Sequence, residues 1–114
     1  MAVKPIPEGY RTITPYLIVP GVGELIDFLK KAFHAQELHR TTSPDGTVRH
    51  AEMQIGDSKL MMGEASEQWP AIPGSILLYV PDVDACFQRA LDAGAEVVME
   101  VTDQFYGDRS GGVK

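Results

Sequence analysis

His50 and Glu52 are the side chains of this sequence whose types and spacing best suit chemistry. They stand two residues apart in the stretch HAEMQI, which alternates like a β-strand, so both side chains share one face. An imidazole and a carboxylate on a concave face could contribute to a metal site. We favour a solvated polar strand face as the explanation of the pair, because Ala51, Met53 and Ile55 already supply a face for helix packing.

The remaining reactive side chains have structural interpretations. Cys86 lies in a predicted helix beside Phe87 and is expected to be a buried, inert thiol. As the only cysteine it excludes an intrachain disulfide and fits a reducing cytoplasm. His34 and His39 are expected at the surface, and no Ser-His-Asp or Cys-His arrangement is suggested by spacing.

Composition limits the class of protein. The 114 residues are 44% hydrophobic and 23% charged, as in one soluble globular domain spanning residues 1–114. The formal net charge of −6 argues against nucleic acid or an anionic membrane as partner. The stretch MAVKPIPEGY lacks the apolar core of a signal peptide, and no run approaches the length of a membrane span. We therefore expect an acidic, cytoplasmic domain.

An internal repeat predicts how the chain is organised. VPGVGELIDFLKKAF begins at Val19 and VPDVDACFQRALDAG begins at Val80. Each copy follows a β-rich run, at residues 12–19 and 74–80, and precedes an extended one. Two fused βαβββ modules explain this period, the first over residues 12–65 and the second over residues 75–114, with a linker at 66–74. The fold class is therefore α+β.

Helix and strand patterns fill in each module. Residues at helical spacing form the apolar side of the first helix, namely Val22, Leu25, Ile26, Leu29 and Phe33. Asp82 is the expected N-cap of the second helix, and Gly94 closes it. In the first copy His34 stands at the position that corresponds to Gly94 in the second copy, which predicts a strained end of the first helix. Three strands joined by two hairpins follow the first helix, at residues 37–42, 47–55 and 59–65. The helix covers one face of each sheet and leaves the other free.

By this symmetry the second module is incomplete. It lacks the end of its third strand and all of its fourth, so its sheet would keep an unpaired edge. We expect either that the sequence is a truncated or partial chain, or that a partner subunit donates the strand.

Three stretches carry a resemblance to a known family. IDFLKKAF, HAEMQIGDSKLMM and VTDQFYGDRSGGVK are similar to the vicinal oxygen chelate superfamily of glyoxalases, bleomycin-resistance proteins and extradiol dioxygenases, and particularly to its PhnB-like branch. The resemblance implies paired βαβββ modules that form a concave sheet cup, closed by a final strand that this chain lacks. It also implies a homodimer.

The resemblance further implies where metal ligands would stand. In the metal-dependent members His, Gln or Glu come from the first and last strand of each module. Here those positions hold Thr14, Ser75 and either Met61 or Met62, and the fourth lies beyond the sequence. Hydroxyls and a thioether are poor ligands for divalent transition metals. We therefore expect no cofactor; a divalent metal enters only under the alternative that His50, Glu52 and Glu64 bind it.

The expected ligand pocket is the lining of the cup. Alternation along the strands, together with the linker, selects an apolar and aromatic set with a few hydroxyls: Thr14, Tyr16, Ile18, Leu60, Met62, Trp69, Ser75, Leu77 and Tyr79. Tyr106 and Arg109 are candidates for its entrance. Each large apolar residue could equally belong to the core, and Asp108 and Arg109 could simply stabilise a turn.

Two functions follow from these expectations. The first is a metal-free small-molecule-binding protein that sequesters an aromatic or cationic compound, as the bleomycin-resistance members do; the acidic surface favours a cation. The alternative is a divalent-metal-dependent lyase or dioxygenase of the glyoxalase type with non-standard ligands. A relative of the fold with neither activity is the third possibility, so whether the protein is an enzyme stays open.

Overall fold

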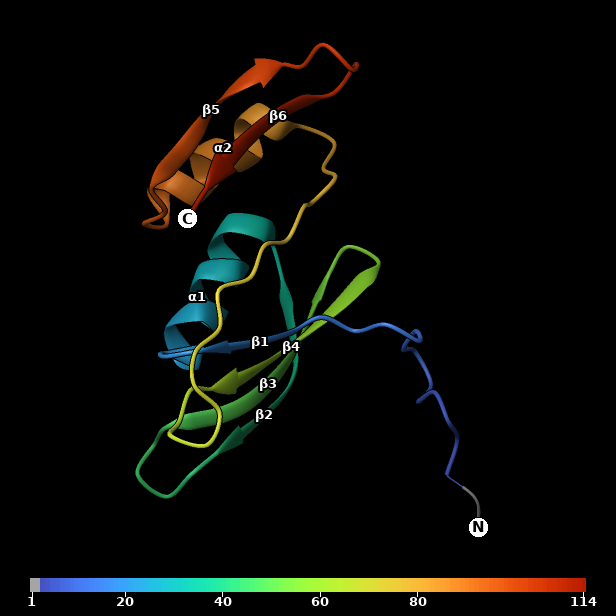
Figure 1. Cartoon of the computed structure of the whole chain (residues 1–114), viewed down its shortest axis with the longest axis vertical. Helices are drawn as coiled ribbons and strands as arrows, with labels where there is room; N and C mark the ends of the chain where they lie inside the picture. Colours follow the sequence, from blue (N-terminus) through green and yellow to red (C-terminus); the bar gives the residue numbers. More distant parts are fainter. Residues whose placement is uncertain (1–2) are drawn as a thin grey trace.

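The computed structural model describes residues 3–114 as two units placed side by side (Figure 1). The first unit has strands β1 (Tyr16–Val19), β2 (Gln36–Thr42), β3 (Val48–Ile55) and β4 (Ser58–Glu64), in the order β1-β4-β3-β2, with helix α1 (Val22–Phe33). The second unit has helix α2 (Val83–Asp92) and the hairpin of β5 (Val97–Asp103) and β6 (Arg109–Val113). The predicted α+β class and the βαβββ order of the first module are confirmed.

Helix α1 and one face of the four-stranded sheet form the core. Val22, Ile26 and Leu29 follow one another at helical spacing and are buried. They pack against side chains of the sheet that include Ala51 and Met53. Full burial of each large apolar side chain contributes about 1.5–3 kcal/mol, so this interface holds the first unit together. The opposite face of the sheet, which we call the open face, is not covered by a helix.

The two ends of α1 have unusual caps. At its start Gly21 has a φ of 89°, a value that favours glycine, and offers no side chain to cap the helix. The Glu64 carboxylate, at the end of β4, accepts hydrogen bonds from the backbone N–H groups of Gly21 and Val22 at 2.8 and 3.1 Å. At the other end His34 has a φ of 56°, which confirms the predicted left-handed position.

The register of β4 corrects one sequence expectation. Met61 pairs with Tyr16 of β1 and with Glu52 of β3, so its side chain belongs to the open face. Leu60 and Met62 point the other way and are buried under α1. Our placement of Leu60 and Met62 in the lining of the cup was therefore wrong, because a strand reverses its faces with a shift of one residue.

The second unit corrects another expectation. Residues 75–80, predicted as a strand, are extended without pairing to any strand. Their counterpart β1 pairs within its own unit only with β4, and the described residues contain no second-unit counterpart of β4. The segment therefore has no neighbouring strand with which to form hydrogen bonds. Leu77 and Tyr79 are 71% and 84% exposed as a result.

The helices join the units. Helices α1 and α2 pack against each other, and Arg89 Nε donates to the carbonyl oxygen of Ala32 at 3.2 Å. The radius of gyration is 15.8 Å, above the value of about 13 Å expected for a compact chain of this length. The molecule is therefore elongated, as Figure 1 shows. Within residues 3–114 neither helix is long and apolar enough to cross a membrane.

Candidate functional site

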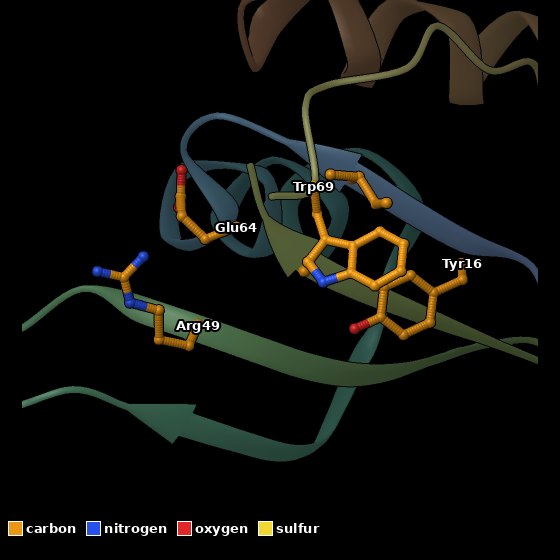
Figure 2. Close-up of a pocket in the computed structure, with 6 residues that line it drawn as sticks. Tyr16, Arg49, Glu64 and Trp69 are labelled. Atoms are coloured by element: carbon orange, nitrogen blue, oxygen red, sulfur yellow. The ribbon is translucent and has the colours of Figure 1, made fainter. Parts of the chain in front are cut away.

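A cavity of about 410 Å³ opens beside strands β1, β3 and β4 of the four-stranded sheet (Figure 2). Its lining comes from β1, β3, β4 and the linker: Tyr16, Ile18, Arg49, Gly63, Glu64 and Trp69. In Figure 2 the Trp69 indole lies beside the Tyr16 ring, with Arg49 and Glu64 at the other end. The cavity thus combines an aromatic end with one residue of each charge, an arrangement suited to a small planar molecule.

A short loop fixes Trp69 over the sheet. The backbone N–H of Ser66 donates to the carbonyl oxygen of Trp69 at 2.8 Å, and the Trp69 N–H donates to Ser66 Oγ at 3.1 Å. Both ends of the loop are tied to β1, through Ala65 N–H to Val19 O at 2.9 Å and Ile72 N–H to Ile18 O at 3.4 Å. The backbone of Trp69 is therefore held at the cavity, and the residue is 61% exposed.

A β-bulge in β3 directs Arg49 to the same cavity. Thr41 pairs with His50 while the next residue, Thr42, pairs with Val48, so Arg49 has no partner on β2. Bulges often change the direction of a side chain near functional sites. Val48 is buried in the core, so the extra residue leaves both Arg49 and His50 off the core face. Simple alternation from Val48 to His50, as the sequence suggests, is not what the structure shows.

Gly63 makes room for Tyr16. A Cβ atom added at Gly63 would lie 2.9 Å from the Tyr16 hydroxyl oxygen, closer than real contacts allow. The missing side chain therefore lets the phenol lie across β4 and reach β3. There the Tyr16 hydroxyl is 3.1 Å from His50 Nδ1, and His50 Nε2 is 3.3 Å from Glu52 Oε2.

The N-terminal segment completes this chain of polar groups. The Tyr10 hydroxyl donates to Glu52 Oε1, and Lys59 Nζ donates to the carbonyl oxygen of Gly9 at 2.6 Å while lying 4.6 Å from the Tyr10 ring centroid. The bond from Tyr10, together with that to His50, lowers the pKa of Glu52. Burial and the neighbouring carboxylate raise the pKa of Tyr10 to about 12. Glu52 is thus a carboxylate and Tyr10 a protonated phenol at neutral pH.

The structure brings three of the predicted pocket residues together. Tyr16, Ile18 and Trp69 line the cavity. Thr14 is half-buried just before β1 and does not line it. Ser75, Leu77 and Tyr79 lie on the exposed segment between the units, also outside it.

The candidate entrance residues lie in the second unit. Tyr106 is 61% exposed in the loop between β5 and β6. Arg109 donates two hydrogen bonds to Asp84, at 2.9 and 3.0 Å, and a third to Asp103 at 3.1 Å. These carboxylates raise the pKa of Arg109. Its role here is to tie the hairpin to α2, which matches the alternative that it stabilises local structure.

The donor atoms of the described residues do not fit a divalent metal. Glu64 is held at the N-terminus of α1 and is not grouped with His50 and Glu52. Within residues 3–114 no three His, Cys, Asp or Glu side chains lie close enough to hold one ion. The family's ligand positions carry the hydroxyls of Thr14 and Ser75 and, by the register of β4, Met61 on the open face.

Three residues at the site escaped the sequence analysis. The direction of the Arg49 side chain depends on a bulge that no residue pattern in the sequence indicates. Tyr10 contacts Glu52 only in the folded protein. Gly63 could have been found, because a glycine inside a strand often marks close approach of another group.

The fold and the cavity define a class of protein: paired modules of strands and helices with an open sheet face that holds a site. A family model described as the Glyoxalase/Bleomycin resistance protein/Dioxygenase superfamily matches residues 12–112. The chain therefore belongs to this superfamily, as the sequence motifs predict.

Two mycobacterial relatives match most of this chain. The uncharacterized protein Mb0911c of Mycobacterium bovis is 41% identical over 110 residues, which cover 87% of this chain and 72% of the relative. Rv0887c of Mycobacterium tuberculosis matches at 41% identity over 65% of its own length, so the chain spans only about two thirds of these relatives.

Two solved structures show the fold. TioX from Micromonospora sp. ML1 superimposes with a TM-score of 0.68 at 26% identity, covering 91% of this chain and 86% of TioX. The PhnB protein from Bacillus cereus has a TM-score of 0.68 at 16% identity over 90% of each chain, a likeness in fold alone.

Proposed function

We propose that this protein is a metal-free small-molecule-binding protein that holds a planar aromatic compound in the cavity beside Trp69. The observation that carries the proposal is that a hydrogen-bonded loop holds the backbone of Trp69 at the cavity, where its indole and the Tyr16 ring both form part of the lining. Two aromatic side chains beside one another offer the stacking and edge contacts that aromatic ligands use. The net charge of −6 attracts a cationic ligand more than an anionic one.

Binding rather than chemistry is favoured by the donor atoms at the site. Three of the four ligand positions of the metal-dependent members carry groups that bind divalent ions poorly here, and Glu64 is engaged in capping α1. The aromatic contacts need no metal. A protein with this arrangement sequesters its ligand instead of transforming it.

The experiment measures the binding of ethidium, a planar aromatic cation, by calorimetry before and after treatment with EDTA. We expect binding that survives the chelator, and a loss of at least about fivefold in affinity for Trp69→Leu, since a stacked aromatic partner contributes on the order of 1–3 kcal/mol. Phe105→Leu is the matched control, because Phe105 is 99% exposed in the second unit. The sole tryptophan also allows quenching of its fluorescence to report contact directly.

Two results would contradict the proposal. One is equal loss of affinity in both variants, which would place the ligand elsewhere. The other is a near-stoichiometric transition metal in protein purified without chelator, measured by elemental mass spectrometry, with binding abolished when that metal is removed.

A further inference from the structure

The polar chain from Tyr10 to Tyr16 has a fixed direction, and this direction determines what the cavity offers to a ligand. Glu52 receives a bond at each carboxylate oxygen, from Tyr10 at Oε1 and from His50 Nε2 at Oε2. A carboxylate can only accept hydrogen bonds. The lowered pKa of Glu52 keeps it ionised at neutral pH, so Nε2 of His50 must carry the proton.

The tautomer of His50 then fixes the role of Tyr16. In the neutral imidazole only one ring nitrogen carries a proton, and the other accepts. With the proton on Nε2, Nδ1 accepts, and the Tyr16 hydroxyl 3.1 Å away must donate to it. The Tyr16 hydroxyl therefore donates its single proton to His50, and only its oxygen lone pairs are available to a ligand in the cavity.

We propose that Tyr16, positioned by His50 and Glu52, is a hydrogen-bond acceptor that selects aromatic ligands bearing an O–H or N–H group. Tyr16 lines the cavity beside Trp69, so a ligand stacked on the indole presents its ring substituents to this oxygen. Gly63 fixes the place of the hydroxyl, since any side chain there would displace it. The inference rests on the proposed binding function and adds the chemical class of the ligand.

The binding test compares 2-naphthol, which has an O–H group, with 2-methoxynaphthalene, which has none. At pH 8 we expect 2-naphthol to bind about fivefold to tenfold more tightly, the effect of one hydrogen bond. Tyr16→Phe removes that preference while both compounds still bind. Tyr79→Phe is the control, because Tyr79 is 84% exposed away from the cavity and should keep the preference. An unchanged preference in Tyr16→Phe would overturn the inference.

A second measurement tests the inference without any ligand. Nitrogen-15 NMR of the His50 ring should show Nε2 protonated and Nδ1 bare in the wild type at pH 8. Glu52→Gln should let the other tautomer appear, because an amide can also donate to Nε2. A proton on Nδ1 in the wild type would overturn the inference, since Tyr16 would then be free to donate. If ethidium binds but neither naphthalene does, the proposed function stands and the NMR result alone decides the role of Tyr16. If ethidium does not bind either, the proposed function fails.

Discussion

The two units of this molecule have similar sequence patterns but differ in the number of paired strands and in the size of the buried core. The first has four paired strands and nearly all of the buried core; in the second only Cys86 and Ala90 are buried among the hydrophobic residues. The described part of the second unit has no counterpart of the fourth strand, and its counterpart of β1, residues 75–80, is unpaired. In the first unit β4 pairs with both β1 and β3 and supplies Glu64 to α1.

This difference between the units shows the structural role of the fourth strand. Without such a strand beside it, the segment at 75–80 remains unpaired, and α2 depends on its own residue for a cap. Asp82 fills that role by accepting from the Ala85 N–H at 3.1 Å, as the sequence predicts. The cavity lies entirely within the first unit and the linker, where β4 has organised the sheet. The candidate site therefore lies in the unit whose four strands are paired.

The largest expected difference between the units is in the free energy of unfolding, when the same change from Met to Ala is made in each of them. Met53→Ala on β3 should lower the free energy of unfolding by about 2–5 kcal/mol, because Met53 is fully buried and its loss leaves a cavity. Met99→Ala on β5 should cost less than about 1 kcal/mol, because Met99 is 44% exposed. Urea unfolding followed by circular dichroism measures both values. Equal losses would mean that the second unit is as well packed as the first.

A smaller loss of stability is expected when the N-terminal cap of α1 or of α2 is removed. Glu64→Ala should destabilise the protein by about 1–2 kcal/mol, since it leaves two N–H groups at the start of α1 without their acceptor. Asp82→Ala removes one cap bond from α2 and should cost about 1 kcal/mol.

The caps also differ in their link to the cavity. Only Glu64→Ala should alter ethidium binding, because Glu64 lines the cavity whereas Asp82 lies in the second unit. A change in binding caused by Asp82→Ala would show that the cavity depends on both units.

The smallest expected effect concerns a surface ion pair in the first unit. Hydrogen bonds from Arg40, and then from Lys30, lower the pKa of Glu37 to about 2. Because the folded pKa lies below the unfolded value, the stabilisation is present above about pH 4.5 and is lost as the pH falls toward 2. Glu37→Gln should therefore cost about 0.5 kcal/mol at pH 7 and almost nothing at pH 2.

Unfolding of this variant at several pH values checks the sign of the dependence. Glu67→Gln is the matched control, since Glu67 is exposed in the linker. A cost for Glu37→Gln that grows toward low pH would contradict the assignment of the ion pair.

Much of the fold could be predicted from local patterns. The spacing of Val22, Ile26 and Leu29 predicts α1, and the alternation of Ala51 and Met53 predicts the buried face of β3; both are confirmed. The residue types at 75–80 favour a strand equally well, but a strand needs a neighbour. The missing fourth strand that the repeat predicts leaves this segment without one, and it stays unpaired.

The candidate site was predictable only in part, for a related reason. Tyr16 and Trp69 stand out by type and position, and they line the cavity. Leu60 and Met62 were assigned to the wrong face because the register of β4 depends on its pairing with β1 and β3. Arg49 enters through a bulge that arises between two strands.

The sequence by itself determined the family, the order of the elements and the aromatic residues available for binding. These depend on spacing along one chain, which helix and strand periodicities convert directly into faces. Tertiary structure alone decided that Glu64 caps a helix, that Gly63 admits the Tyr16 ring and that Tyr10 reaches Glu52. Each of these contacts joins residues far apart in the chain, and only the packing of the sheet brings their atoms within hydrogen-bonding distance.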